Sequence, residues 1–265
     1  MKNHLFNVIS KVRNTTPLVH AITNYVTIND CANILLAFGA SPAMVEAYDE
    51  SYDFSKISSC LYLNLGSLPK EQEIAMIMAA TSAKNNNVPV VLDPVACGAI
   101  PRKLDVINKL IELGRIDVIK GNAGEIKFLS GLSSKTRGVD SIDDGEGLVE
   151  ACKTLAKKYN CIIAATGQID VVSDGTKTAL IKNGVQLFTK ITGAGCMLGA
   201  LCAGACGAEN DKFTAVCAAI AWMNIAGEKA FHETKLPASF KVKLIDYIYG
   251  LTEQEFKDNL DIKLL

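Results

Sequence analysis

The sequence predicts an α/β fold, in which a doubly wound and mostly parallel sheet carries helices on both faces and includes one β-hairpin. Segments with strand-like and helix-like patterns alternate along most of the chain, which is typical of this class. The run VPVVLDP (88–94) is largely apolar up to its aspartate, as expected of a strand buried on both faces. No linker, low-complexity tract or repeat divides the 265 residues, so we expect one domain over 1–265.

In the first half of the chain, glycine and proline mark where the expected elements end or begin. Gly39 follows the helical pattern of 27–38, at the position where a helix closes in a left-handed turn. Pro69 opens the helical pattern of 69–86 and is expected at its first position, where a missing N–H is tolerated. The strands expected in this half cover 17–23, 41–45, 61–68 and 88–94.

The same alternation continues in the second half, which ends in helices. Asp174 and Gly175 form the expected turn of a hairpin over 170–184, because Asp-Gly is favoured between antiparallel strands. A polar tail is expected after Gly250. The remaining expected strands are 116–122 and 161–167, and the helices are 103–114, 123–132, 146–160, 195–207, 212–231 and 238–250.

Composition argues against several kinds of partner and metal site. The formal net charge is −1 and no basic block occurs, so neither a nucleic acid nor an anionic membrane surface is an expected partner. Nine cysteines, without a CxxC pair and mostly within apolar stretches, indicate reduced thiols and a cytoplasmic location. None of the three histidines has a cysteine at ligand spacing, which argues against zinc.

The stretch 191–208 contains no charged side chain and therefore has to be considered as a membrane span. It contains TGAG, which is expected to form a turn, so only about a dozen residues remain for a helix, whereas a span needs about 20. We therefore expect a buried helix. The N-terminal segment also lacks the apolar core of a signal peptide.

Several glycine-rich or polar sequences follow the predicted strands. They are VLDPVACGA, VIKGNAGE, AATGQID and, after the hairpin, ITGAGC. In an open parallel sheet, ligands bind beyond the carboxyl ends of the strands, where loops and helix N-termini converge. We therefore expect these sequences to line one shared crevice.

The sequence TGAG is typical of a turn that leads into a helix and cradles a phosphate group. Gly193 and Gly195, with Ala194 between them, let successive N–H groups point at one spot, and the helix dipole adds positive potential there. Such a cradle stabilises charge that develops on phosphate oxygens during transfer. The alternative is a tight turn whose small residues serve packing only.

Charged residues follow two of the predicted strands. Glu125 is either the partner of Asn122 in a helix-capping box or a carboxylate that holds Mg²⁺ at the rim of the crevice. Asp93 either initiates the turn before Pro94 or joins Glu125 in holding a metal–nucleotide complex. Lys120 is expected to meet nucleotide phosphates as a cation.

The motifs TGAG at a helix start and NxxE after an earlier strand, in parallel α/β order, resemble the ribokinase-like small-molecule kinases. Most of these carry an aspartate after GAG, the base that activates the substrate hydroxyl, whereas this chain has Cys196. The run PLVHAITNYVTINDCANILLAFGASPAM, with LNLGSL, LDPVACGA, IKGNAGEI, TGQIDVVSDG and KITGAGCML, is similar to the hydroxyethylthiazole kinases. The similarity spans about residues 15–200, and cysteine after GAG is usual in that family.

This resemblance implies that ATP, with Mg²⁺, phosphorylates the primary alcohol of 4-methyl-5-(2-hydroxyethyl)thiazole. It implies a homotrimer with each site formed between neighbouring subunits. It also implies individual roles: Met44, Asn24 and Val26 contact the thiazole, Gly193, Gly195 and Cys196 lie at the reacting hydroxyl, Lys120, Thr166, Asn122 and Ala194 bind nucleotide, and Asp93 and Glu125 serve the metal.

Some of these residues also have simpler structural interpretations. Met44 at a strand end is consistent with core filling, Asn24 with the end of a strand, and Thr166 with a turn cap. His20 is expected to be a partly buried polar group rather than a base.

Cys196 is expected to position the acceptor hydroxyl rather than to act as a strong base. A free thiol is mostly protonated at neutral pH, and a neighbouring γ-phosphate opposes its ionisation. Phosphoryl transfer through a loose transition state also needs little proton removal early in the reaction.

Three other functions stay open at this point. A kinase for a related alcohol, such as hydroxymethylpyrimidine, is disfavoured by the ITN and SPAM motifs. A thiol enzyme, in which Cys196 attacks the substrate, lacks a histidine at a convincing spacing. A nucleotide sensor without turnover is disfavoured because Asp93, Glu125 and TGAGC are all retained.

Overall fold

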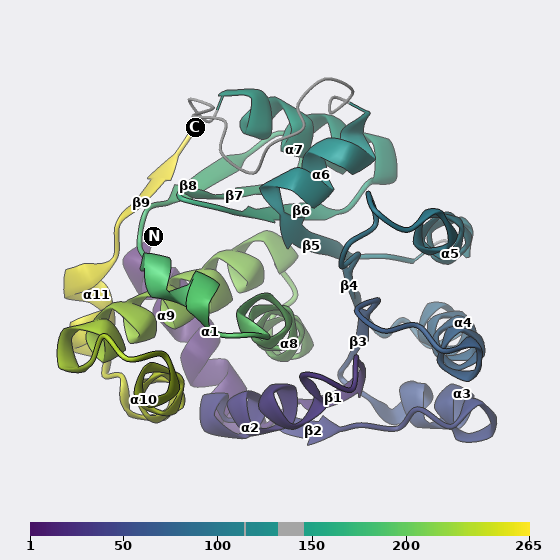
Figure 1. Cartoon of the computed structure of the whole chain (residues 1–265), viewed down its shortest axis with the longest axis horizontal. Helices are drawn as coiled ribbons and strands as arrows, with labels where there is room; N and C mark the ends of the chain where they lie inside the picture. The colour runs from purple at the N-terminus through teal and green to yellow at the C-terminus, as the bar shows by residue number, and fades with distance from the viewer. Residues whose placement is uncertain (114, 132–145) are drawn as a thin grey trace.

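The computed structural model describes residues 1–113, 115–131 and 146–265, and a nine-stranded sheet runs through this part of the chain (Figure 1). The strand order is β2-β1-β3-β4-β5-β6-β7-β8-β9. Neighbours from β2 to β6 are parallel, and β7, β8 and β9 extend the sheet in antiparallel pairs. The strands are β1 (Leu18–Ile22), β2 (Ser41–Ala43), β3 (Cys60–Asn64), β4 (Val90–Asp93), β5 (Val118–Asn122), β6 (Ile162–Thr166), β7 (Asp170–Ser173), β8 (Thr178–Ile181) and β9 (Ile262–Leu264).

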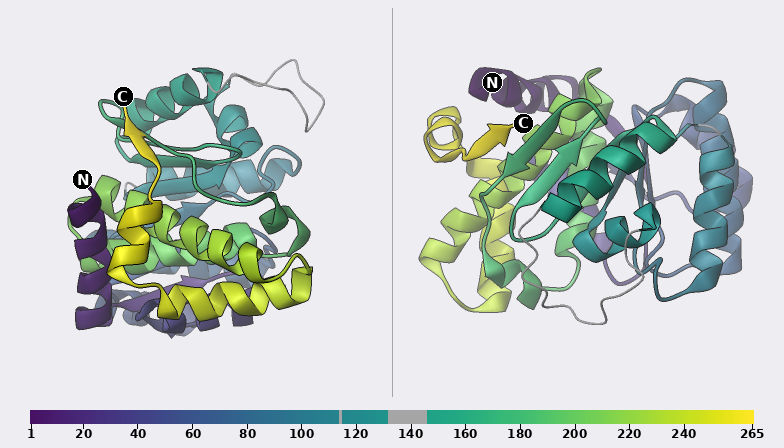
Figure 2. Two further views of the ribbon diagram at one scale, coloured as in Figure 1. Left: turned by 90° about the vertical axis from the view of Figure 1, so that its left-hand side faces the viewer. Right: turned by 90° about the horizontal axis from the view of Figure 1, so that it is seen from above.

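Helices cover both faces of the sheet, as predicted for a doubly wound fold. In Figure 1, α1, α2, α8, α9 and α10 lie on one side and α4 to α7 on the other, and Figure 2 shows the sheet between the two groups. The helices are α1 (Lys2–Thr15), α2 (Ile28–Phe38), α3 (Tyr48–Ile57), α4 (Lys70–Asn85), α5 (Pro101–Glu112), α6 (Ala123–Ser130), α7 (Glu146–Tyr159), α8 (Ala194–Ala208), α9 (Lys212–Glu233), α10 (Pro237–Gly250) and α11 (Glu253–Asn259), with a 3-10 turn at Gln186–Lys190.

Each face of the sheet packs into its own apolar core. All four residues of β4 are buried, and they alternate between the two faces. Val91 belongs to the core that contains α8 and α9, whereas Val90 and Leu92 belong to the core that contains α4 and α5. The apolar run 88–94 is therefore a strand buried on both faces, as predicted.

The predicted turns are confirmed at two glycines. Gly39 closes α2 with a left-handed φ of 103°. Gly175 takes a φ of 92° between β7 and β8, and Asp174 Oδ1 accepts a hydrogen bond from Lys177 N at 2.6 Å. Pro69 differs from the prediction, because α4 begins at Lys70 and the proline lies immediately before it. The predicted helix ends at 114 and 132 lie outside the described residues.

The prediction of a polar tail after Gly250 is wrong. This segment forms α11 and β9, which pairs antiparallel with β8. Phe256 of α11 is fully buried against Trp222, at 5.3 Å between ring centroids, and this contact anchors the segment. Helices α1 and α3 and the 3-10 turn were also not predicted from the sequence.

The uncharged stretch 191–208 contains α8, a helix of 15 residues whose side chains are largely buried in the core. Within the described ranges, no helix combines the length and apolar character that crossing a membrane would require.

Candidate active site

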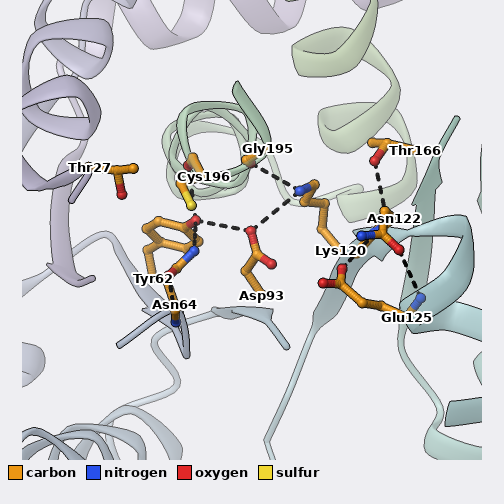
Figure 3. A network of polar contacts seen from close by, with 12 residues as sticks. Thr27, Tyr62, Asn64, Asp93, Lys120, Asn122, Glu125, Thr166, Gly195 and Cys196 are labelled. Atoms are coloured by element: carbon orange, nitrogen blue, oxygen red, sulfur yellow. Dashed lines mark hydrogen bonds and ion pairs between the residues drawn. The ribbon is translucent and has the colours of Figure 1, made fainter. Parts of the chain in front are cut away.

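The carboxyl ends of four parallel strands meet at one edge of the sheet, beside the N-terminus of α8 (Figure 3). Asn64 ends β3 and pairs in register with Asp93 at the end of β4. Asn122 ends β5 and pairs in register with Thr166 at the end of β6. Strand pairing thus gathers polar residues that are distant in the sequence, as expected for a crevice at this edge.

The TGAG turn forms the start of α8. Gly193 is its N-cap, with a left-handed φ of 85°, and a Cβ at this position would lie 2.7 Å from Thr27 Cγ2. Both the backbone conformation and the space therefore require glycine. Because glycine has no side chain that can cap the helix, the N–H groups of the first turn, from Ala194 to Cys196, suit an anionic group at the positive helix end.

Asp93 and Lys120 form a buried ion pair beside this turn. Lys120 Nζ lies 3.3 Å from Asp93 Oδ2 and donates to Gly195 O at 3.0 Å (Figure 3). Burial raises the pKa of Asp93 to about 6, although the Lys120 ammonium opposes this shift. Burial lowers the pKa of Lys120, but the Asp93 and Glu125 carboxylates outweigh it, so the pKa stands above its ordinary value. At neutral pH both groups are therefore charged.

Glu125 and Asn122 form the helix-capping box that the sequence offered as one interpretation. Asn122 Oδ1 accepts from Glu125 N at 2.9 Å, and Glu125 Oε2 accepts from Asn122 N at 2.8 Å. Glu125 Oε1 also accepts from Ala96 N at 2.8 Å, which ties α6 to the loop after β4. The Glu125 carboxylate therefore caps α6 and also lies close enough to Asp93 for its negative charge to raise the pKa of Asp93.

Cys196 lies in the first turn of α8 and is half-buried, whereas the other eight cysteines are buried and free. Asn24 Nδ2 lies 3.4 Å from its sulfur and donates to it. The Tyr62 hydroxyl lies 2.9 Å from its carbonyl oxygen. Asn24, predicted to contact the thiazole, and Cys196, predicted to lie at the reacting hydroxyl, are therefore neighbours in the structure.

The other predicted substrate residues follow the first two strands of the sheet. Val26 is 69% exposed, and its N–H donates to Asn24 Oδ1 at 3.1 Å. Met44 directly follows β2 and packs, half-buried, against the core that contains α8. Thr166 Oγ1 lies 3.4 Å from Gly121 O, a contact that links β6 to β5.

His20 is more deeply buried than the partly buried polar group that the sequence predicted. It is fully buried in β1, with its ring nitrogens 2.8 Å from Ser55 Oγ and 2.7 Å from Val45 O. Because the Val45 carbonyl only accepts, Nε2 carries the proton and Nδ1 accepts from the serine. Burial lowers the pKa of His20, so the ring is neutral and holds the segment next to Met44.

Three buried residues of the site were not identified from the sequence. Tyr62 and Asn64 belong to β3. The Tyr62 hydroxyl contacts Asp93 Oδ2 and Cys196 O, and Asn64 donates a hydrogen bond to that hydroxyl. Lys103 of α5 donates to Gly66 O and Val95 O, both at 2.8 Å, and so joins the loops after β3 and β4. Tyr62 and Asn64 could have been identified from the sequence, because they are polar residues in an otherwise apolar strand and buried polar side chains need partners.

Asp93 and Glu125 offer the oxygen ligands that Mg²⁺ prefers. Each already accepts hydrogen bonds from protein donors, so a magnesium ion that keeps several of its waters fits this pair better than a fully protein-coordinated ion. Among the described residues, no group of three or more His, Cys, Asp and Glu side chains is arranged to hold a metal ion.

The chain is similar to known proteins of one family over nearly its whole length. The family model for the hydroxyethylthiazole kinase family matches residues 9–254. Hydroxyethylthiazole kinase 2 of Clostridium botulinum (strain Loch Maree / Type A3) is 66% identical over 249 residues, covering 94% of this chain and 95% of the relative. Hydroxyethylthiazole kinase of Clostridium kluyveri is 62% identical over 250 residues, covering 94% and 93%.

Solved structures show the same relationship. The hydroxyethylthiazole kinase structure from Pyrococcus horikoshii OT3 has a TM-score of 0.92 at 34% identity and covers 98% of each chain. The ADP complex of Bacillus subtilis pyridoxal kinase has a TM-score of 0.58 at 17% identity, covering 80% of this chain and 91% of that one, which shows a shared ribokinase-like fold. The chain belongs to the hydroxyethylthiazole kinase family.

Proposed function

We propose that this protein transfers the γ-phosphoryl group of ATP to the primary hydroxyl of 4-methyl-5-(2-hydroxyethyl)thiazole, a step of thiamine biosynthesis or salvage. The observation that carries this proposal is the glycine-capped N-terminus of α8, with the Asp93–Lys120 pair beside it. A helix N-terminus and an ammonium group stabilise negative charge on a transferring phosphoryl group. High identity to named hydroxyethylthiazole kinases supports the choice of alcohol.

The thiazole alcohol is assigned to the surface formed by Asn24, Val26 and Met44, with Gly193 and Cys196 at the reacting hydroxyl. The contact between the Asn24 amide and the Cys196 sulfur supports this grouping. Cys196 positions the hydroxyl, and the loose transition state of phosphoryl transfer leaves little work for a strong base.

The nucleotide is assigned to the strand ends and the helix start, through Lys120, Thr166, Asn122, Ala194 and Gly195. Lys120 is supported most strongly, because its ammonium group is anchored to Gly195 O at the phosphate cradle. Asp93 and Glu125 would hold Mg²⁺, largely through water. When bound, the ion would neutralise part of the charge on the nucleotide phosphates.

We further propose a homotrimer in which neighbouring subunits complete each site. Val26 is 69% exposed, and the apolar side chains of Tyr25 and Tyr48 are 56% and 54% exposed. A second subunit that covers Val26 would shield the thiazole from water. Sedimentation equilibrium measures the mass directly, and a monomer at assay concentration would contradict the shared site.

A cytoplasmic location is proposed from the thiols. All nine cysteines are free and eight of them are buried, an arrangement that suits a reducing compartment.

The test of the proposed function is identification of the product. Incubation with ATP, Mg²⁺ and the thiazole alcohol is expected to yield the thiazole monophosphate by mass spectrometry. Asp93→Asn is the matched control, because it removes a negative charge beside Lys120 while preserving side-chain shape. Absence of a phosphorylated thiazole with the unmodified protein would refute the proposal.

A thiol enzyme finds no support in the site. The hydrogen-bonding partner of the Cys196 sulfur in the described part of the chain is the Asn24 amide nitrogen. An amide N–H cannot take a proton from a thiol, so Asn24 cannot be the general base that a covalent thiol nucleophile needs.

A further inference from the structure

A chain of buried hydrogen bonds runs from the sulfur of Cys196 to the middle of β3 (Figure 3). Asn24 Nδ2 donates to Cys196 Sγ at 3.4 Å and to Asn64 Oδ1 at 2.8 Å. Asn64 Nδ2 donates to the Tyr62 hydroxyl at 2.9 Å. Asn24 is 5% exposed, and Asn64 and Tyr62 are fully buried, so the contacts among these three side chains are shielded from water, whereas the sulfur of Cys196 is half-buried.

Two backbone N–H groups fix the direction of both amides. Val26 N donates to Asn24 Oδ1 at 3.1 Å, and Gly66 N donates to Asn64 Oδ1 at 3.0 Å. Because a backbone N–H can only donate, each amide oxygen must face it and each amide nitrogen must point the other way. Asn24 therefore presents an N–H to the sulfur of Cys196, and the sulfur is the acceptor.

The Tyr62 hydroxyl closes the chain at its other end. Its oxygen accepts from Asn64, so its proton is directed at Cys196 O, 2.9 Å away, or at Asp93 Oδ2, 3.3 Å away. At neutral pH the phenol is uncharged and has this one proton to donate. Cys196 is thus held at both its sulfur and its carbonyl oxygen by one network.

Two glycines leave the space that this network occupies. A Cβ at Gly66 would lie 2.6 Å from Asn24 Nδ2. A Cβ at Gly199 of α8 would overlap the Tyr62 hydroxyl. The side chains of this network therefore account for the absence of a side chain at Gly66, in LNLGSL, and at Gly199, after TGAGC.

We propose that Asn64 and Tyr62 are positioning residues, which act through Asn24 and through the Cys196 carbonyl to set the direction of the Cys196 sulfur toward the acceptor alcohol. The link to the alcohol rests on the proposed kinase function, whereas the direction of the sulfur does not. Removing the Asn64 amide leaves the Asn24 side chain held by Val26 N alone, so the donor at the sulfur is less firmly fixed.

The first test compares Asn64→Leu with Asn183→Leu. Asn183 is a matched control, because it is a buried asparagine whose amide bonds Glu228 and Asn259 O in a separate network. The measurement is the rate at which iodoacetamide alkylates Cys196, the one cysteine that is not buried, read from the mass of its peptide.

The Asn24 amide holds the half-buried sulfur in one orientation, so Asn64→Leu, which releases the sulfur into other orientations, is expected to slow alkylation by about threefold or more, with Asn183→Leu unchanged. An unchanged or faster rate in Asn64→Leu would overturn the proposal. Should the leucine variant fail to fold, Asn64→Ser carries the same expectation with a smaller side chain.

The second readout separates positioning from general loss of structure. Asn64→Leu is expected to lower kcat for the thiazole alcohol by about tenfold, with the KM for ATP unchanged. Equal losses in Asn64→Leu and Asn183→Leu would show a structural role only and would overturn the proposal. If the unmodified protein phosphorylates no thiazole, the kinase function fails, while the alkylation rates still decide the role of Asn64.

Discussion

At the residue scale, the cysteine after GAG is the main departure from the ribokinase-like pattern. Its sulfur accepts a hydrogen bond from Asn24, and the residue lies in the first turn of α8, whose N-terminus suits an anion. An oxygen at the same position could accept the same hydrogen bond, because serine and aspartate both carry acceptors. Positioning therefore does not depend on sulfur.

This leads to a prediction for two variants of Cys196. Cys196→Ser is expected to keep kcat within about tenfold of the unmodified enzyme, and Cys196→Asp to equal or exceed it, because a carboxylate adds a base. Steady-state ADP release with the thiazole alcohol measures both. A serine variant that binds both substrates but does not turn over would contradict the positioning role.

The charged residues of the strands were predictable, whereas the uncharged polar residues of β3 were not. Asp93 and Lys120 stand out because charged side chains interrupt apolar strands near glycine turns. Tyr62 and Asn64 occupy the middle and end of β3, and their contacts to α8 depend on how the sheet is covered. The sequence carries no local signal for a contact between residues 62 and 196.

At the element scale, α8 depends on close approach to β3. Gly199 lies where a side chain would meet Tyr62, whereas the nearest atoms to a Cβ at Gly204 are side-chain ends of Leu35 and Phe38, at 3.3 and 3.4 Å. Gly199 and Gly204 therefore differ in what an added methyl group would displace.

Gly199→Ala is accordingly expected to lower the free energy of unfolding by about 1–3 kcal/mol through overpacking. Gly204→Ala is the control in the same helix, and its gain in helix propensity, about 1 kcal/mol, offsets a small shift of flexible neighbours. Urea unfolding of both variants measures the difference. Equal stability of the two variants would contradict the assigned contact.

The first residue of β7, Asp170, carries a second buried carboxylate. Asp170 accepts from Gly167 N at 3.0 Å and from Asn224 Nδ2 at 2.7 Å. Burial raises the pKa of Asp170 to about 6, against the opposing effect of these hydrogen bonds. The folded state therefore binds this proton more tightly than the unfolded state.

Asp170 is expected to make stability fall as pH rises from about 4 to about 6, because its contribution is complete below the unfolded pKa and is lost above the folded one. Relative to Asp170→Asn, which cannot titrate, the free energy of unfolding should change by roughly 3 kcal/mol across this window. Denaturant unfolding of both proteins at several pH values tests this. A difference that stays constant with pH would contradict the shift.

The elements were predicted unevenly for physical reasons. The parallel strands were recognisable because burial on both faces makes them apolar. Helix α3 buries only the small polar side chains of Ser51 and Ser55, so it shows no apolar stripe. Strand β9 has three residues and only Ile262 is partly buried, so its place is set by pairing with β8 rather than by its own pattern.

At the scale of the whole molecule, one sheet edge gathers the ends of β3, β4, β5 and β6 with the start of α8. The sequence predicted this edge, because the order of strands and glycine turns determines where the carboxyl ends lie. It did not predict the antiparallel extension by β9, which links the C-terminus to the hairpin.

The central claim is the identity of the alcohol that this edge of the sheet phosphorylates. The most direct test is ADP release with ATP and Mg²⁺, with 4-methyl-5-(2-hydroxyethyl)thiazole and hydroxymethylpyrimidine assayed separately and in competition. We predict turnover that depends on the thiazole and is unaffected by the pyrimidine. Turnover with the pyrimidine and none with the thiazole would leave the kinase fold in place and contradict the substrate assigned here.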